Sequence, residues 1–201
     1  MQPKLSDTSL LKTASYVAGR WATDSADRLP VFNPATGETV AEVNTVNRSG
    51  AEEAIAAAHD AMMTWRAAPA KTRAQVLRRW FDLMMAHQED LAIIMTMEQG
   101  KTLAESRGEI AYGAAFMEWF GEQAKRIDGD VIPAPSSDRR VICIKQPVGV
   151  VAAITPWNFP TAMIARKAAP ALAAGCSIVI KPASETPLSA LAMAELAERA
   201  G

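Results

Sequence analysis

The sequence predicts an α/β protein in which a parallel sheet, covered by helices, follows a long helical segment. The main evidence is the stretch 149–189, where short apolar runs alternate with helical apolar spacing in the order strand, helix, strand, helix. Strands that are apolar on both faces are typical of such a sheet. A polar cluster follows each apolar run, and ligands of these sheets bind beyond the carboxyl ends of the strands.

The composition indicates a folded chain and argues against nucleic acid and membrane as partners. The 201 residues are 49% hydrophobic, and 21 basic and 22 acidic residues are mixed along them. Because there is no basic patch, polybasic stretch or signal-peptide core, we expect neither nucleic acid nor membrane as a partner. Cys143 and Cys176 lack CxxC spacing, which indicates a reducing compartment, the cytoplasm. We find no metal-ligand spacing and expect no metal site.

The N-terminal segment is expected to contain an arm, a short strand and a hairpin. Residues 1–13 are predicted to be a loosely held arm, and Tyr16 to Trp21 a short strand. Val31-Phe32 and Val40 to Val43 predict a hairpin around residues 33–37, because Asn-Pro and Thr-Gly are turn sequences.

A helical period begins near Ser49 and predicts four consecutive helices. Ser49 with Glu52, and Thr102 with Glu105, form capping-box patterns. The helices are expected at about 50–65, 72–87, 88–99, ending at Gly100, and 102–125. Their Met and aromatic residues are predicted to be core, so that these helices form a scaffold and not a site.

A ribbon and the sheet complete the predicted order of elements. Two strands, 127–132 and 140–146, are joined by a loop, and a ribbon so apolar is not stable alone. We therefore expect it to pair with another part of the protein or with another subunit. The sheet elements are then a strand at 148–154, a helix at 161–174 stopped by Gly175, a strand at 177–180, and a helix that starts within 184–187.

At TPWNFP (155–160) and KPAS (181–184) the sequence resembles the aldehyde dehydrogenase superfamily. The resemblance also includes NPATGE (33–38), TMEQGK (96–101), GEIAYGAAFMEWF (108–120) and KQPVGVVAAITPWNFP (145–160). Within the superfamily it is most similar to bacterial NADP-dependent succinate-semialdehyde dehydrogenases.

The resemblance implies three regions and a homo-oligomer. Residues 1–126 would be the N-terminal hairpin and helices of the cofactor-binding domain, and 127–147 the β-ribbon of an oligomerisation arm. Residues 148–201 would begin a Rossmann-like NAD(P)-binding unit.

One departure from the family concerns the reacting groups. Family members carry the thiol nucleophile and the general-base glutamate in a later part of the chain, and neither Cys143 nor Cys176 lies in the nucleophile motif. The resemblance therefore implies the N-terminal portion of an enzyme, an incomplete fold without the catalytic domain. We expect no dehydrogenase turnover from these 201 residues alone.

Asn158 is the candidate catalytic residue. Oxidation of an aldehyde by a thiol passes through an oxyanion, and the loss of one N–H donor to such an oxygen typically costs about 10²–10³ in rate. Pro156 and Pro160 restrict the backbone on either side of Asn158. The residues alone fit equally well a cap for the helix that starts near Pro160. The resemblance implies the oxyanion role.

The resemblance implies that residues of both polar clusters bind the cofactor. The family lysine at the strand end, here Lys181, contacts the adenosine ribose, and the residue three positions later helps to select the cofactor. Ser184 is small and neutral and leaves room for a 2′-phosphate, which favours NADP, with NAD possible; Glu185 could instead supply an acid. Capping by Ser184 and Thr186 is the structural alternative. The expected cofactor-binding residues are Thr155, Pro156, Trp157, Asn158, Lys181, Pro182, Ala183 and Ser184, with a core position as the alternative for Trp157.

Arg166 is the candidate substrate-binding residue. It is one of two charges in an apolar helix, and a guanidinium binds a carboxylate through two parallel hydrogen bonds. A structural ion pair is the alternative, and the resemblance implies a clamp for the acid group of a small semialdehyde. The predicted reaction is oxidation of succinate semialdehyde to succinate with NADP. The alternatives are a non-catalytic truncated binding or assembly module and a dehydrogenase for another aldehyde, such as glutarate semialdehyde.

Overall fold

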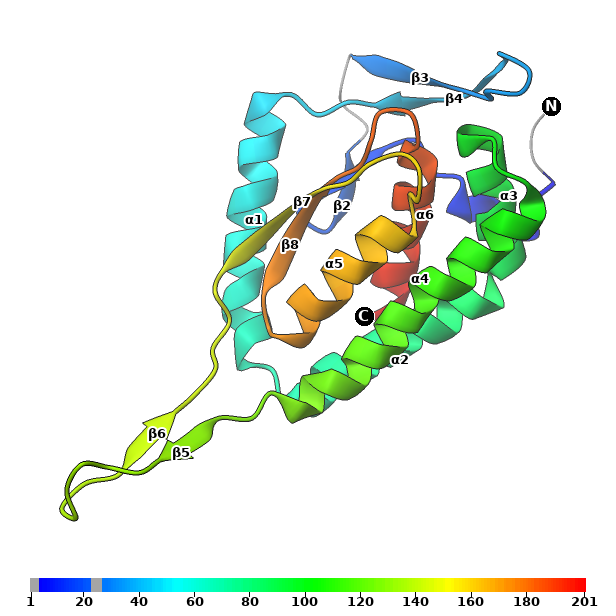
Figure 1. The fold of residues 1–201 in the computed structure, drawn as a ribbon. Helices are drawn as coiled ribbons and strands as arrows, with labels where there is room; N and C mark the ends of the chain where they lie inside the picture. Colours follow the sequence, from blue (N-terminus) through cyan, green and yellow to red (C-terminus); the bar gives the residue numbers. More distant parts are fainter. Residues whose placement is uncertain (1–3, 23–26) are drawn as a thin grey trace.

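The computed structural model describes residues 4–22 and 27–201, and it confirms the predicted α/β class. The described ranges contain six helices and four short strand pairs, and one of these pairs, β5–β6, forms an extended ribbon. Figure 1 shows their arrangement. The helices are α1 (Arg48–Ala67), α2 (Ala70–Ala86), α3 (Gln88–Gln99), α4 (Leu103–Gln123), α5 (Ala162–Ala173) and α6 (Pro187–Ala200), with 3-10 turns η1 (Thr8–Leu10) and η2 (Ala124–Arg126). The strands are β1 (Ser15–Val17), β2 (Arg20–Ala22), β3 (Arg28–Phe32), β4 (Thr39–Asn44), β5 (Asp130–Ile132), β6 (Val141–Cys143), β7 (Val150–Ile154) and β8 (Ser177–Lys181).

The predicted strand–helix–strand–helix unit is confirmed. Strands β7 and β8 pair in parallel, from Val150 opposite Ser177 to Ile154 opposite Lys181, and α5 forms the crossover between them. Helix α1 contacts one side of this small sheet and α5 the other (Figure 1). The carboxyl ends of both strands therefore meet at one edge.

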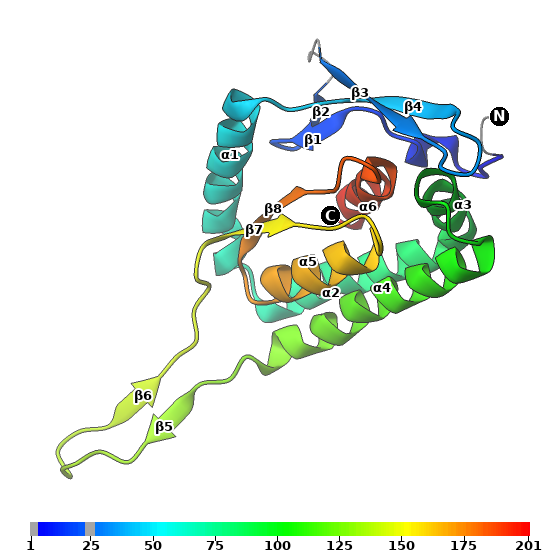
Figure 2. The same ribbon diagram turned by 45° about the horizontal axis from the view of Figure 1, so that its top comes forward.

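The helical segment forms most of the core. Helices α2 and α4 lie antiparallel along each other, and α3, α5 and α6 pack against them (Figure 2). Met84, Met95 and Met117 are fully buried, as the apolar spacing predicts. Met63 on α1 and Tyr112 and Trp119 on α4 are 55%, 50% and 58% exposed, so the core prediction is wrong for these three residues.

Local signals place most helix ends. Helix α3 stops at Gly100, whose φ of 89° lies in the left-handed region, and the Thr102–Glu105 capping box opens α4. The predicted Ser49 cap is wrong. The carboxamide oxygen of Asn47 accepts from the Gly50 N–H at 3.0 Å, so α1 starts earlier and Ser49 lies inside its first turn.

The expected loose arm is wrong over residues 4–13. Leu10 is fully buried, and the Asp90 carboxylate accepts the N–H groups of Ser6 and Asp7, each at 2.8 Å. Residues 1–3 of that arm lie outside the described part of the chain. The single strand expected over 16–21 is the hairpin β1–β2, which turns at Ala18 and Gly19.

The predicted ribbon is present but shorter. Strands β5 and β6 are antiparallel and project from the body of the molecule (Figures 1 and 2). All six of their residues are exposed. Within the described ranges, no helix combines the length and apolar character that crossing a membrane requires.

Candidate active site

The two polar clusters begin side by side at the carboxyl edge of the sheet. Ile154 and Lys181 are register partners, and the Thr155 N–H donates to the Lys181 carbonyl at 3.2 Å. The placement of both clusters at neighbouring strand ends, predicted from the sequence, is confirmed.

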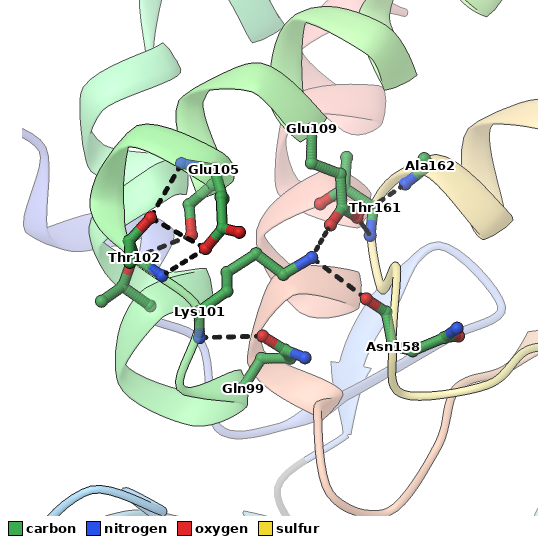
Figure 3. A network of polar contacts seen from close by, with 10 residues as sticks. Gln99, Lys101, Thr102, Glu105, Glu109, Asn158, Thr161 and Ala162 are labelled. Atoms are coloured by element: carbon green, nitrogen blue, oxygen red, sulfur yellow. Dashed lines mark hydrogen bonds and ion pairs between the residues drawn. The ribbon is translucent and has the colours of Figure 1, made fainter.

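The first cluster presents its side chains to solvent. Trp157 is 53% exposed and Phe159 42%, so the core position considered for Trp157 is wrong, whereas Thr155 is buried. The exposed Asn158 carboxamide points away from the protein contacts of its backbone (Figure 3). It forms no hydrogen bond with another described residue, which leaves its N–H groups available to a ligand.

Glu109 of α4 holds the start of α5. Its side chain is 1% exposed, and its Oε1 accepts the N–H groups of Thr161 at 2.9 Å and Ala162 at 3.1 Å (Figure 3). Gly113, one turn further along α4, lets α5 approach closely: a Cβ there would lie 3.1 Å from Thr161 Cγ2. Helix α5 is therefore capped by Glu109, and the capping role considered for Asn158 is wrong.

Lys101, in the short link between α3 and α4, connects Glu109 to the Asn158 backbone. Its ammonium forms a short ion pair with the Glu109 carboxylate and donates to the Asn158 carbonyl at 3.0 Å (Figure 3). The same ammonium lies 4.4 Å from the centroid of the Phe159 ring. A cation, a buried carboxylate and an aromatic face thus converge beneath the loop that carries Asn158.

The second cluster is also open to solvent at its polar positions. Lys181 and Ser184 are exposed, Pro182 and Ala183 are half-buried, and the Lys181 ammonium donates to the neighbouring Pro182 carbonyl at 3.1 Å. An ammonium and a small hydroxyl that face solvent beside the sheet edge fit the ribose and phosphate groups of a dinucleotide.

Glu98 of α3 holds the start of α6. Its carboxylate accepts the N–H groups of Leu188 at 2.6 Å and Ser189 at 2.7 Å. The Thr186 side chain makes no capping bond, so capping by Ser184 and Thr186 is wrong. Burial raises the pKa of Glu98 to about 7, with a smaller contribution from the negative charge of Glu109, and the hydrogen bonds from Ser189 and Leu188 oppose this shift.

Arg166 lies on α5 and is exposed. Its guanidinium is 5.8 Å from the centroid of the Phe116 ring, a contact with an aromatic face and not with a carboxylate. Nothing in the described part of the chain supports the ion pair considered as its alternative role. In the described ranges, no cluster of His, Cys, Asp and Glu could hold a metal ion.

Sequence reasoning missed Glu98, Lys101 and Glu109. In the sequence, TMEQGK and GEIAYG stand out only as parts of the family resemblance, and apolar spacing predicts that the four helices are scaffold. A useful signal was the presence of Glu98 among the apolar residues of a helix, because a buried carboxylate requires hydrogen-bond partners.

Comparisons with known proteins extend these observations. A sequence model of the aldehyde dehydrogenase family matches residues 21–201. Glutarate-semialdehyde dehydrogenase of Pseudomonas aeruginosa is 60% identical over 98% of this chain and 41% of its own length. The NADP(+) succinate-semialdehyde dehydrogenase of Escherichia coli K12 is 56% identical over 98% of this chain and 41% of its own.

Solved structures agree with the sequence matches. The crystal structure of succinate-semialdehyde dehydrogenase from Burkholderia pseudomallei superposes with a TM-score of 0.97 at 56% identity, over 99% of this chain and 42% of that one. An aldehyde dehydrogenase from Brucella melitensis biovar abortus 2308 has a TM-score of 0.98 at 54% identity, over 100% of this chain and 42% of its own. The chain thus spans about two fifths of the length of the relatives it matches. The family match over most of the chain and the superposed folds together show that this chain belongs to the aldehyde dehydrogenase family.

Proposed function

We propose that this chain provides the oxyanion donor and part of the NADP site of a cytoplasmic dehydrogenase that oxidises succinate semialdehyde to succinate. The observation that carries the proposal is the adjacency of Thr155 and Lys181 at the strand ends, which starts the Asn158 loop beside the Lys181–Ser184 segment. Ligands of parallel sheets bind at such edges.

Asn158 would act on the charge that develops during reaction. When a thiolate adds to the aldehyde carbon, the carbonyl oxygen becomes negative, and an N–H donor already in place stabilises it more than it stabilises the neutral aldehyde. Its carboxamide is exposed and unbonded within the described chain, while its backbone is tied down, which suits a fixed donor.

NADP would bind with its adenosine ribose at Lys181 and Ser184, beside Pro182 and Ala183. The Lys181 ammonium would contact the ribose and the 2′-phosphate, and the small Ser184 leaves space for that phosphate. When bound, NADP accepts the hydride. Thr155, Pro156 and Trp157 would lie on the nicotinamide side.

Arg166 would bind the acid group of the substrate. The relatives include dehydrogenases named for succinate semialdehyde, glutarate semialdehyde and 3-sulfolactaldehyde, all of which carry an anionic group distant from the aldehyde. Glutarate semialdehyde is the second candidate, because its dehydrogenase from P. aeruginosa is 60% identical.

The test uses the protein expressed from the complete reading frame that encodes these residues. We expect Asn158→Ala to lower kcat by about 10²–10³ with a much smaller change in the Kd for NADP, because the N–H donor contributes most to binding of the transition state. Arg166→Ala should raise KM for succinate and glutarate semialdehydes, lower kcat/KM for both, and spare an uncharged aldehyde such as butanal.

Arg48→Ala, at an exposed position of α1, is the matched control. An Asn158→Ala protein with parental kcat would contradict the oxyanion role. Equal losses for butanal and the semialdehydes in Arg166→Ala would contradict the clamp. A chain that binds NADP and joins subunits without turnover would support the assembly-module alternative.

A further inference from the structure

We propose that Lys101 is a positioning residue for Asn158: its ammonium holds the Asn158 carbonyl, and Glu109 anchors both that ammonium and the start of α5. This inference rests on the proposed function, since that function gives Asn158 its role. Lys101 acts through the Asn158 backbone and not on the substrate.

The Lys101 ammonium has as many acceptor groups around it as it has N–H donors. An ammonium has three donors and no acceptor. The Glu109 carboxylate, the Asn158 carbonyl at 3.0 Å and the Phe159 ring at 4.4 Å are the three acceptor groups arranged around it. The side chain is 12% exposed, so little water competes for these contacts.

Lys101 is itself held at a fixed place. Gly100 ends α3, Thr102 opens α4 with a capping box, and the Lys101 N–H donates to Gln99 Oε1 at 2.9 Å. Lys101 therefore lies in a short link between two packed helices, and these contacts hold its backbone in place.

Glu109 binds both Lys101 and the backbone at the start of α5. One carboxylate oxygen pairs with Lys101 and the other accepts the N–H groups of Thr161 and Ala162. The loop is thus held at Asn158 and again three and four residues later. The Asn158 side chain itself is exposed, so the tether acts on its backbone.

Such support matters because electrostatic stabilisation depends on geometry. A donor must lie about 2.7–3.1 Å from the position of the oxyanion. A misplacement of about 1 Å can cost on the order of 10²-fold in rate. A backbone tether that prevents this movement contributes to kcat without contacting the reacting atoms.

The decisive variants are Lys101→Met, Lys101→Arg and the double variant Lys101→Met/Glu109→Gln, made in the protein from the complete reading frame. Methionine keeps the length of the stem and removes the cation. We expect Lys101→Met to lower kcat by about 10–10²-fold, with a smaller change in KM and an unchanged Kd for NADP, and Lys101→Arg to restore part of the rate. Amide hydrogen exchange over 158–162 should accelerate in Lys101→Met and not in the exposed control Lys125→Met.

The double variant distinguishes two roles of Lys101, positioning Asn158 and neutralising the charge of Glu109. In Glu109→Gln the side-chain oxygen can still accept N–H groups while the buried negative charge is gone. If Lys101 only neutralised Glu109, the double variant would regain parental kcat and overturn the proposal; if it positions Asn158, the double variant stays slow.

Exchange data distinguish failure of this inference from failure of the proposed function. A parent protein that oxidises no aldehyde contradicts the proposed function, and the exchange rates of residues 158–162 then still decide whether Lys101 restrains the loop. Unchanged exchange in Lys101→Met overturns the inference whatever the activity.

Discussion

Three acidic side chains of α3 and α4 each accept two backbone N–H groups from a distant segment. Asp90 binds Ser6 and Asp7, Glu98 binds Leu188 and Ser189, and Glu109 binds Thr161 and Ala162. The last two pairs lie at helix N-termini, where a carboxylate also interacts favourably with the helix dipole. These contacts join the helical segment to the arm and to both helices that follow the sheet strands.

Glu98 predicts a pH-dependent component of stability. Its pKa in the folded chain is about 7, above its ordinary value of 4.5, so between these values the folded chain binds more protons than the unfolded chain. This contribution to the free energy of unfolding is fully present below about 4.5 and is lost as the pH rises through about 7. We expect the urea midpoint to fall between pH 5 and pH 8, and Glu98→Gln to make that fall shallower.

Glu105→Gln is the control, because Glu105 is exposed and its pKa is lowered, mainly by the hydrogen bond from Thr102, which moves its titration below this range. Urea unfolding at several pH values measures the slopes. Identical slopes for the parent and Glu98→Gln would show that Glu98 does not titrate in this range.

At the scale of elements, the link between α3 and α4 packs closely against the turn between β3 and β4. Gly100 has φ 89°, and a Cβ on it would lie 2.6 Å from Pro34 Cγ in the turn between β3 and β4. Gly100, which stops α3, and Pro34, in the Asn-Pro turn, therefore lie against each other. The same link places Lys101 beneath the Asn158 loop.

Gly100→Ala should destabilise the chain by more than the roughly 1–2 kcal/mol cost of the left-handed conformation, because the new methyl group also collides with Pro34. Gly108→Ala is the matched control within α4: a Cβ there meets nothing within 4 Å, and alanine in a helix gains about 0.5–1 kcal/mol over glycine. Urea unfolding of both variants measures the difference. Equal stabilities would contradict the role assigned to Gly100.

At the scale of the whole molecule, apolar side chains are exposed on the ribbon and at the ends of β7. Val131 and Ile142 are register partners on the ribbon and are 74% and 67% exposed, and Ile154 is 76% exposed. Exposed apolar strands favour pairing with other chains. We expect the chain on its own to self-associate or aggregate.

Val131→Glu combined with Ile142→Lys should raise the monomer fraction, because opposite charges keep the cross-strand pair while removing the apolar surface. Light scattering after size exclusion measures the mass, and circular dichroism confirms that the helices remain. Ala51→Glu with Ile55→Lys, on the exposed side of α1, controls for added charge. A ribbon variant that associates like the parent would exclude the ribbon as the contact surface.

Short-range patterns were enough to predict the order of the elements. Apolar periodicity, the Gly100 stop, the Thr102–Glu105 box and the β7–α5–β8 unit all depend on residues close in sequence, and the structure confirms them. The predicted Ser49 cap is wrong and Asn47 caps α1, because both side chains can accept a backbone N–H and only their backbone conformations decide which one does.

The sequence alone established the fold class, the family resemblance and the position of the Asn158 and Lys181 clusters at neighbouring strand ends. The tertiary structure alone decided that the arm is docked, that Glu98 and Glu109 cap α6 and α5, and that Lys101 supports Asn158. Glutamates and lysines are usually solvated, and apart from the apolar neighbours of Glu98 the nearby sequence does not mark these exceptions. Their partners lie 52 to 91 residues away, so only packing of the whole chain determines which backbone groups reach them.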